Sequence, residues 1–527
     1  MKKPGFVKAK LIQLYLLFTI GSGFGQVPTL WGDLDKGMHS VGFKTIEAHD
    51  LSRLSIPELD IMGKMIHPKE ENLGRPVHIS IWYPAIETKK EKVLYEDYIT
   101  EISKTVDFKP IDQNDKLRAL EFYTDEIKRF DNPAFTLDGL RTFSKRRTES
   151  VLNAKEAKGK FPIVLFPSYL SPANQSILSE YLASHGYIVV GTPQHGAGSN
   201  LPEISVTGIE AQASDLAFAM AYVKELPFAN HQVAIMGVGF NATSALALIT
   251  RYPEINAFVS LDGGVTVENE KRMLQQTSVF DLSLIRTPMM LIYSKHPDVS
   301  MTVIDEYKYS DRYLFQFPTM REFDLTDFGL LQQFYPGLIG KALGDTKLGS
   351  EWAYRYVLNF LSFTLKNDLA SGQFIKNKPF DNGVPDNIIK ESMKKSISPA
   401  PTLEELKRMI ADRGLTGLAT TYETLRMQDA QPFSTKVMTD LINWLGYLRD
   451  TDFTIRNELL KIWMESHPNS SKGYFLAARI ANAQGQKAKA MDYYKEALQT
   501  LESDTDPYLD NPTRMRIKAV AAQALSN

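Results

Sequence analysis

The 527-residue chain contains no cysteine. This absence excludes disulfide-stapled folds, thiolate catalysis, zinc sites built on cysteine and lipid attachment to an N-terminal cysteine. Any side-chain nucleophile must therefore be an oxygen or a nitrogen.

Long hydrophobic runs are missing as well. The first 25 residues carry four lysines, an apolar run at 11–20 and the small-residue stretch GSGFG, which is the pattern of a secretory signal. The run contains Gln13 and Thr19 and falls well short of the roughly 20 apolar residues that a spanning helix needs. We therefore predict a cleavable signal peptide at 1–25 rather than a membrane anchor, a secreted or periplasmic location and no membrane span.

Basic charge is not in excess. The net charge is −2, and removal of the signal, which holds four lysines and no acid, would take it to −6. A mildly acidic protein argues against nucleic acid and anionic membranes as partners. There is no glycine-rich loop of phosphate-binding spacing, so no nucleotide cofactor is expected, and no metal site is predicted.

Apolar runs of strand length alternate with helical patterns between residues 160 and 365. Strands are predicted at 77–83, 161–166, 187–191, 233–237, 257–262, 289–293 and 313–317. Continuous apolar strands are typical of a parallel sheet covered on both faces. We predict an α/β domain with a mostly parallel, doubly wound sheet at 26–370, with a helical insertion at 86–158 that shapes the mouth of a pocket.

Beyond residue 370 the pattern becomes helical. We predict a linker at 371–400 and an all-α region at 401–527, which opens with a capping box of Thr402 and Glu405 and a helix ending at Gly414. Six residues have tetratricopeptide spacing: Ala478, Gly485, Ala490, Tyr494, Ala497 and Leu498. The tail is either such a repeat, able to bind a protein partner, or a plain helical hairpin packed on the main domain.

The turn after the strand at 233–237 is the place where α/β-hydrolases carry a nucleophile, in the pattern G-x-S-x-G. Here the turn reads GVGFN at 237–241, without the serine. The chain resembles the secreted branch of the platelet-activating-factor acetylhydrolase and dienelactone-hydrolase-like esterases, which have the α/β-hydrolase fold. The resemblance rests on this turn and on segments at 41–43, 75–85, 160–172, 185–199, 257–264 and 323–328.

The resemblance implies positions for the catalytic groups. The nucleophile position falls on Gly239, the acid position on Asp262 and the histidine position on Glu322. An imidazole can accept the hydroxyl proton and return it to the leaving group, whereas a glutamate is a weak substitute. The triad is therefore expected to be degenerate, and glycine at the centre of the turn relieves its backbone strain.

The resemblance also implies an oxyanion and pocket region. Its members are Ser168 and Tyr169, where the family has a His-Gly pair, and Val238 and Phe240, which flank the nucleophile position. The expected ligand is a small ester or lipid-like molecule.

Displaced residues offer poor substitutes for the triad. None of the nine histidines lies between 297 and 466. His296 follows the strand at 289–293, which is one strand too early for the usual order of serine, acid and histidine. His195 is expected to hold a loop in place by hydrogen bonding. Ser168 and Ser244 lie outside the strained turn that activates a nucleophile.

Three functional hypotheses follow. The first is a secreted pseudo-hydrolase that keeps the fold and binds a ligand. The second is an active carboxylic ester hydrolase with a non-standard arrangement, since binding and the oxyanion hole alone can leave weak catalysis. The third uses Asp262 and Glu322 as an acid/base or metal-binding pair, because two close carboxylates raise one pKa; one hydrogen-bonded Asp and one solvated Glu is the simpler interpretation.

Overall fold

A computed structural model describes residues 29–53, 74–104, 108, 110–169, 171–197, 202–278, 280–447 and 453–526. The predicted signal peptide at 1–25 lies outside these residues. None of the helices in the described ranges combines the length and the apolarity needed to cross a bilayer.

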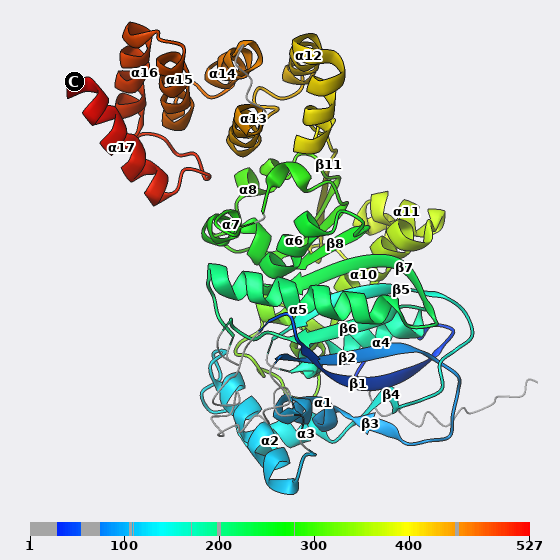
Figure 1. Ribbon diagram of the computed structural model, residues 1–527. Helices are drawn as coiled ribbons and strands as arrows, with labels where there is room; N and C mark the ends of the chain where they lie inside the picture. The colour runs from blue at the N-terminus through cyan, green and yellow to red at the C-terminus, as the bar shows by residue number, and fades with distance from the viewer. Residues whose placement is uncertain are drawn as a thin grey trace, which may run out of the picture.

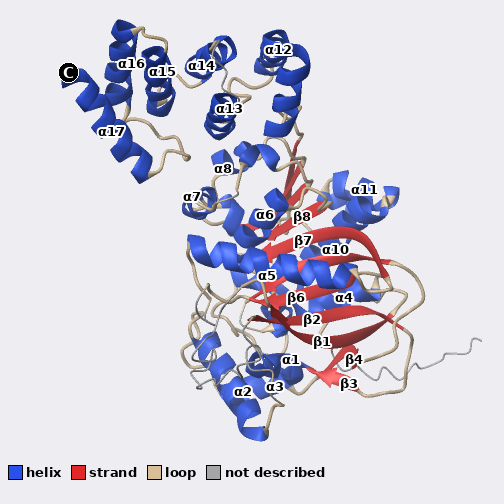
Figure 2. Cartoon of the chain, in the orientation of Figure 1, coloured by secondary structure: helices blue, strands red, loops and turns tan. Residues whose placement is uncertain are grey.

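The main domain is built on an eleven-stranded sheet with the order β11-β10-β9-β8-β7-β5-β6-β2-β1-β4-β3. The strands are β1 (Ser40–Asp50), β2 (Arg75–Ala85), β3 (Lys92–Leu94), β4 (Arg147–Leu152), β5 (Phe161–Ser168), β6 (Ile188–Pro193), β7 (Ala229–Val238), β8 (Ala257–Leu261), β9 (Met289–Ser294), β10 (Arg312–Phe317) and β11 (Lys390–Lys394). All seven predicted strands are confirmed. Figure 2 shows the twisted sheet in red, with helices on its two faces.

The strand order identifies the fold. Strands β5 to β10 pair in parallel with one another, and β2 runs antiparallel to both β1 and β6. The sequence β1-β2-β6-β5-β7-β8-β9-β10, with β2 alone reversed, is that of the α/β-hydrolase fold. The predicted fold class is therefore correct, and the turn after β7 is the turn on which this fold presents a nucleophile.

Alternation along each strand divides the core into two layers. In β5, Ile163 and Leu165 face one layer, and Val164 and Phe166 face the other, as the period of two in a strand requires. One layer is covered by α5 (Val206–Lys224), α6 (Asn241–Arg251), α7 (Glu268–Gln275) and α8 (Met301–Glu306). The other is covered by α4 (Ser176–Ser184), α9 (Asp327–Leu331) and α10 (Thr346–Lys366).

The insertion at 86–158 contains helices, as predicted, and also two strands. Its helices are α1 (Tyr95–Thr100), η1 (Glu101–Lys104), α2 (Gln113–Lys128) and α3 (Leu137–Ser144). Strands β3 and β4 form the sheet edge beside β1. Their short, polar sequences lack the apolar alternation that identifies a strand, so the sequence did not reveal them.

The predicted linker at 371–400 is wrong in part. It contains most of α11 (Leu369–Lys376), η6 (Pro379–Asn382) and the strand β11. Strand β11 pairs antiparallel with β10 and forms one edge of the sheet. Strand β11 reads KESMK, with no apolar pattern. Charged residues on an edge strand discourage pairing with other chains, and they also hide the strand from a periodicity search.

The C-terminal region is helical: α12 (Leu403–Arg426), α13 (Thr435–Tyr447), α14 (Thr454–Ser466), α15 (Ser471–Ala483), α16 (Lys487–Thr500) and α17 (Asn511–Ser526). Figure 1 shows these helices at the end of the molecule opposite α1–α3. The capping box of Thr402 and Glu405 is present, and the helix breaks at Gly414 as predicted. The region contacts the main domain through Asp429, which pairs with Lys308 at 2.5 Å and accepts a hydrogen bond from Tyr309.

Candidate active site at the turn between β7 and α6

The turn after β7 keeps the backbone shape of a nucleophile elbow. Strand β7 ends at Val238 and α6 begins at Asn241, and between them Gly239 has φ +53°. Its amide donates to the carbonyls of Leu261 (3.0 Å) and Asp262 (2.7 Å), which ties the turn to the end of β8. Glycine adopts this left-handed conformation at no steric cost.

Gly237 fixes the close approach of β7 to α6. A Cβ atom at this position would lie 2.4 Å from Ala242 Cα and 2.5 Å from its amide nitrogen. These are backbone atoms, so Gly237→Ala must push strand and helix apart, and we expect a loss of about 1–3 kcal/mol in the free energy of unfolding, measured in guanidinium. The control Gly446→Ala, in α13 and with no atom nearer than 3.9 Å, should be neutral or stabilising by up to about 1 kcal/mol. Equal effects of the two changes would contradict the argument.

Glu322 occupies the space of the missing side chain. It begins η5 (Glu322–Leu325), in the connection after β10. A Cβ atom built on Gly239 would lie 2.1 Å from Glu322 Oε1. The carboxylate therefore lies over the elbow, where a serine side chain would otherwise project, and glycine is the residue that leaves room for it.

Asp262 directly follows β8. Its Oδ1 accepts hydrogen bonds from the amides of Gly263 and Ser294, both at 3.1 Å. Its Oδ2 is buried and has no hydrogen-bond partner among the described residues. The residue has φ +50°, an unfavourable conformation for a non-glycine side chain, and burial raises its pKa.

A third carboxylate, Glu270 in α7, was not found from the sequence. Burial first, and then the charge of Glu322, raise the pKa of Glu270 to about 7. Burial and the charge of Asp262 raise the pKa of Glu322 to about 7, although the residue as a whole is exposed to water on the cavity side. The sequence signal that could have identified Glu270 is its place shortly after the central strand β8.

The two raised pKa values make stability depend on pH. The folded protein holds these protons up to about pH 7, whereas the unfolded chain loses them near 4.5. The free energy of unfolding must therefore fall as pH rises through this window. Glu322→Gln should raise the melting temperature at pH 8 by about 1–2 °C and leave it unchanged at pH 4.5, since water in the cavity screens part of the charge. Scanning calorimetry checks this; a pH-independent difference from wild type would contradict it.

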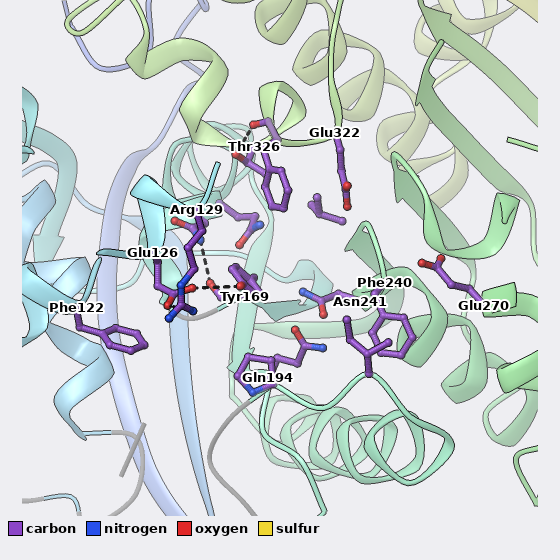
Figure 3. A pocket seen from close by; sticks show the side chains of 16 residues that line it. Phe122, Glu126, Arg129, Tyr169, Gln194, Phe240, Asn241, Glu270, Glu322 and Thr326 are labelled. Carbon is purple, nitrogen blue, oxygen red and sulfur yellow. Dashed lines mark hydrogen bonds and ion pairs between the residues drawn. The ribbon is translucent and has the colours of Figure 1, made fainter. Parts of the chain in front are cut away.

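A cavity of about 670 Å³ opens beside the elbow. Glu322 and Glu270 lie at one side in Figure 3, and Phe122, Glu126 and Arg129 of the insertion lie at the other. Arg129 pairs with Glu126 at 2.5 Å. The insertion thus contributes a wall of the pocket, as expected from the sequence.

Three of the four expected pocket residues line this cavity: Tyr169, Val238 and Phe240. Ser168 does not, because it lies in β5 and its hydroxyl donates to the Thr192 carbonyl at 3.0 Å. The amide of Phe240 follows the nucleophile position, which is where this fold places an oxyanion donor.

The other candidate residues, Ser244, His195 and His296, are not among the described residues that line the cavity beside the elbow. Ser244 is buried inside α6 and does not line the cavity. Burial, and then Arg75, lower the pKa of His195 to about 3, so its ring is neutral at physiological pH. His296 is largely exposed and lies 3.5 Å from Asp298.

Within the described ranges, no group of three or more Asp, Glu or His is arranged to hold a metal ion. The described residues therefore offer no ligand set that would support the metal-binding hypothesis.

Two comparisons with known proteins give matches. The family described as BAAT / acyl-CoA thioester hydrolase C terminal matches residues 216–315, which include the elbow and Asp262 but end before Glu322. A solved ferulic acid esterase from Streptomyces cinnamoneus aligns with a TM-score of 0.43 and 16% identity, over 62% of this chain and 91% of that one. No curated protein gives a match. The α/β-hydrolase fold of the chain rests on its strand order.

Proposed function

We propose that this protein is a pseudo-hydrolase: an esterase-type fold whose cavity binds a small ester or lipid-like ligand without forming an acyl-enzyme. One observation carries the proposal, the 2.1 Å between Glu322 Oε1 and the Cβ position of Gly239. In the described part of the site, the elbow has glycine in place of a nucleophile, and the space above it is filled by a carboxylate rather than an imidazole. Acyl transfer through a side-chain oxygen needs both.

A second candidate function is direct hydrolysis by water. Its support is the pKa of Glu322, raised to about 7, which suits a general base at neutral pH. In this case Glu322 would take a proton from a water molecule attacking an ester carbonyl held at the Phe240 amide.

Hydrolysis of short-chain aryl esters separates the two functions. Wild type and Glu322→Gln should both match the rate of buffer alone between pH 6 and 9. Turnover by wild type that rises with pH through about 7 and is lost in Glu322→Gln would replace the pseudo-hydrolase with the water-activating enzyme. Circular dichroism of the variant establishes that it is folded.

We also propose that the mature protein is secreted or periplasmic, on the signal pattern at 1–25, and that the helical tail serves a protein partner. The packing of α15 against α16 supports a tetratricopeptide-like unit. Phe475 lies against Tyr494, and Ala478 and Ala497 are fully buried between the helices, where such a repeat has small residues.

A further inference from the structure

We propose that the cavity binds an ammonium-bearing ligand with an apolar body, its cationic head between Glu322 and Glu270. The inference rests on the proposed function in that the same cavity is kept for binding. It adds the chemical class of the ligand, which the missing nucleophile does not indicate.

The charge of the cavity is one-sided. Among the described lining residues, three are acids, Glu126, Glu270 and Glu322, and one is a base. The base is Arg129, whose guanidinium is paired with Glu126. Glu322 and Glu270 therefore face the cavity without a basic partner in the lining. Glu270 is half-buried and Glu322 is exposed to the cavity. Neighbouring carboxylates repel each other, so a cation is the group that would compensate both charges.

Unsatisfied oxygen atoms mark the same end. Glu270 Oε2 and Asp262 Oδ2 have essentially no accessible surface and no hydrogen-bond partner in the described structure. The Asp262 side chain is only 3% exposed, and its charge acts on both glutamates. A buried acceptor without a donor costs free energy. Asp262 is not among the described lining residues, so an ammonium group beside the two glutamates would compensate its charge without contacting it.

Aromatic rings and uncharged polar side chains share the rest of the lining. Phe240 lies at the elbow, and Phe122 and Tyr169 lie toward the insertion (Figure 3). Phe323 also lines the cavity; its ring centroid lies 6.4 Å from that of Tyr169, and the two rings are tilted by 53°. Aromatic faces attract cations and bury hydrocarbon. A phosphate-bearing head group is excluded at the acidic end, because the carboxylates would repel it.

Binding should follow the ionisation of the glutamates. Asp262 and Asp298 add negative charge at Glu270, and His296 is the imidazole whose charge acts on Asp262. An aliphatic amine keeps its proton to about pH 10, whereas the glutamates lose theirs near pH 7. Affinity for the amine should therefore rise about tenfold from pH 5.5 to 8.5, with release of protons on binding below pH 7.

Isothermal titration of the full chain with three probes tests the proposal: 4-phenylbutylamine, 4-phenylbutanol and 4-phenylbutyrate. At pH 8 the amine should bind at least about tenfold more tightly than the alcohol, and the acid most weakly. Phosphocholine should not compete. Glu322→Gln and Glu270→Gln should each remove most of the preference for the amine. Glu268→Gln, on the same helix but paired with Arg272, should keep it.

Equal affinities for amine and alcohol, or no heat from the amine at millimolar concentration, overturn the proposal. A preference for the amine that survives both cavity variants also overturns it, because the head group then lies elsewhere. Ester turnover by wild type would contradict the pseudo-hydrolase and leave this inference standing, so the two can fail separately.

Discussion

Gly239→Ser combined with Glu322→His is expected to raise aryl-ester turnover about 10²-fold above wild type, the lower end of what a positioned general base contributes. The elbow already has the required backbone, with φ +53° at residue 239. A side chain from position 322 reaches the Cβ position of residue 239, so an imidazole there can accept the serine proton. Asp262 Oδ2, buried and without a partner, is available to accept the second imidazole N–H.

The single variants are the controls. Gly239→Ser alone leaves Glu322 Oε1 at 2.1 Å from the new Cβ position, so the carboxylate must move and no imidazole is present. Glu322→His alone has no nucleophile. Both should stay at the wild-type rate, and adding Asp262→Asn to the double variant should abolish most of the gain. A folded double variant without a gain would show that the elbow, although similar in shape, is not arranged for catalysis.

Asp215→Ala should cost about 3–5 kcal/mol in the free energy of unfolding, since it leaves a buried arginine without its counter-charge. Arg75, 4% exposed, holds Asp215 with two hydrogen bonds of 2.8 Å from Nε and Nη2. Arg53 adds a third at 2.7 Å. Guanidinium unfolding of wild type and variant measures the loss.

The same variant should loosen one wall of the cavity. Arg75 Nη1 donates to the Gly196 carbonyl at 2.9 Å, in the loop that follows the cavity residue Gln194. Hydrogen exchange at 194–197 should therefore become faster. Asp138→Ala, which breaks an exposed pair with Arg141, should change stability by no more than about 0.5 kcal/mol. Similar losses from both substitutions would mean that the buried ion pair contributes no more than a surface one.

The sequence predicted the central strands of the sheet but did not reveal the strands at and near its edges. Strands β5 to β9 are continuous apolar runs because helices cover both faces, and such runs need no tertiary information to be found. Strand β4, next to the edge strand β3, reads RTESVL, and β11, at the opposite edge, reads KESMK. They are strands because a neighbour satisfies their backbone groups, and positions at or near an edge tolerate polar side chains.

For the site, the resemblance to secreted esterases and the order of motifs along the chain placed Gly239 after β7, Asp262 after β8 and Glu322 in the connection after β10. Parallel strands in this fold end at one edge of the sheet, which is why these positions meet. What tertiary structure alone decided is that the Glu322 carboxylate fills the space above Gly239 and that Glu270 from α7 joins it. Connections after different strands have no sequence relation that fixes the distance between their side chains. That distance, together with the burial that raises both pKa values, is set by how the layers pack.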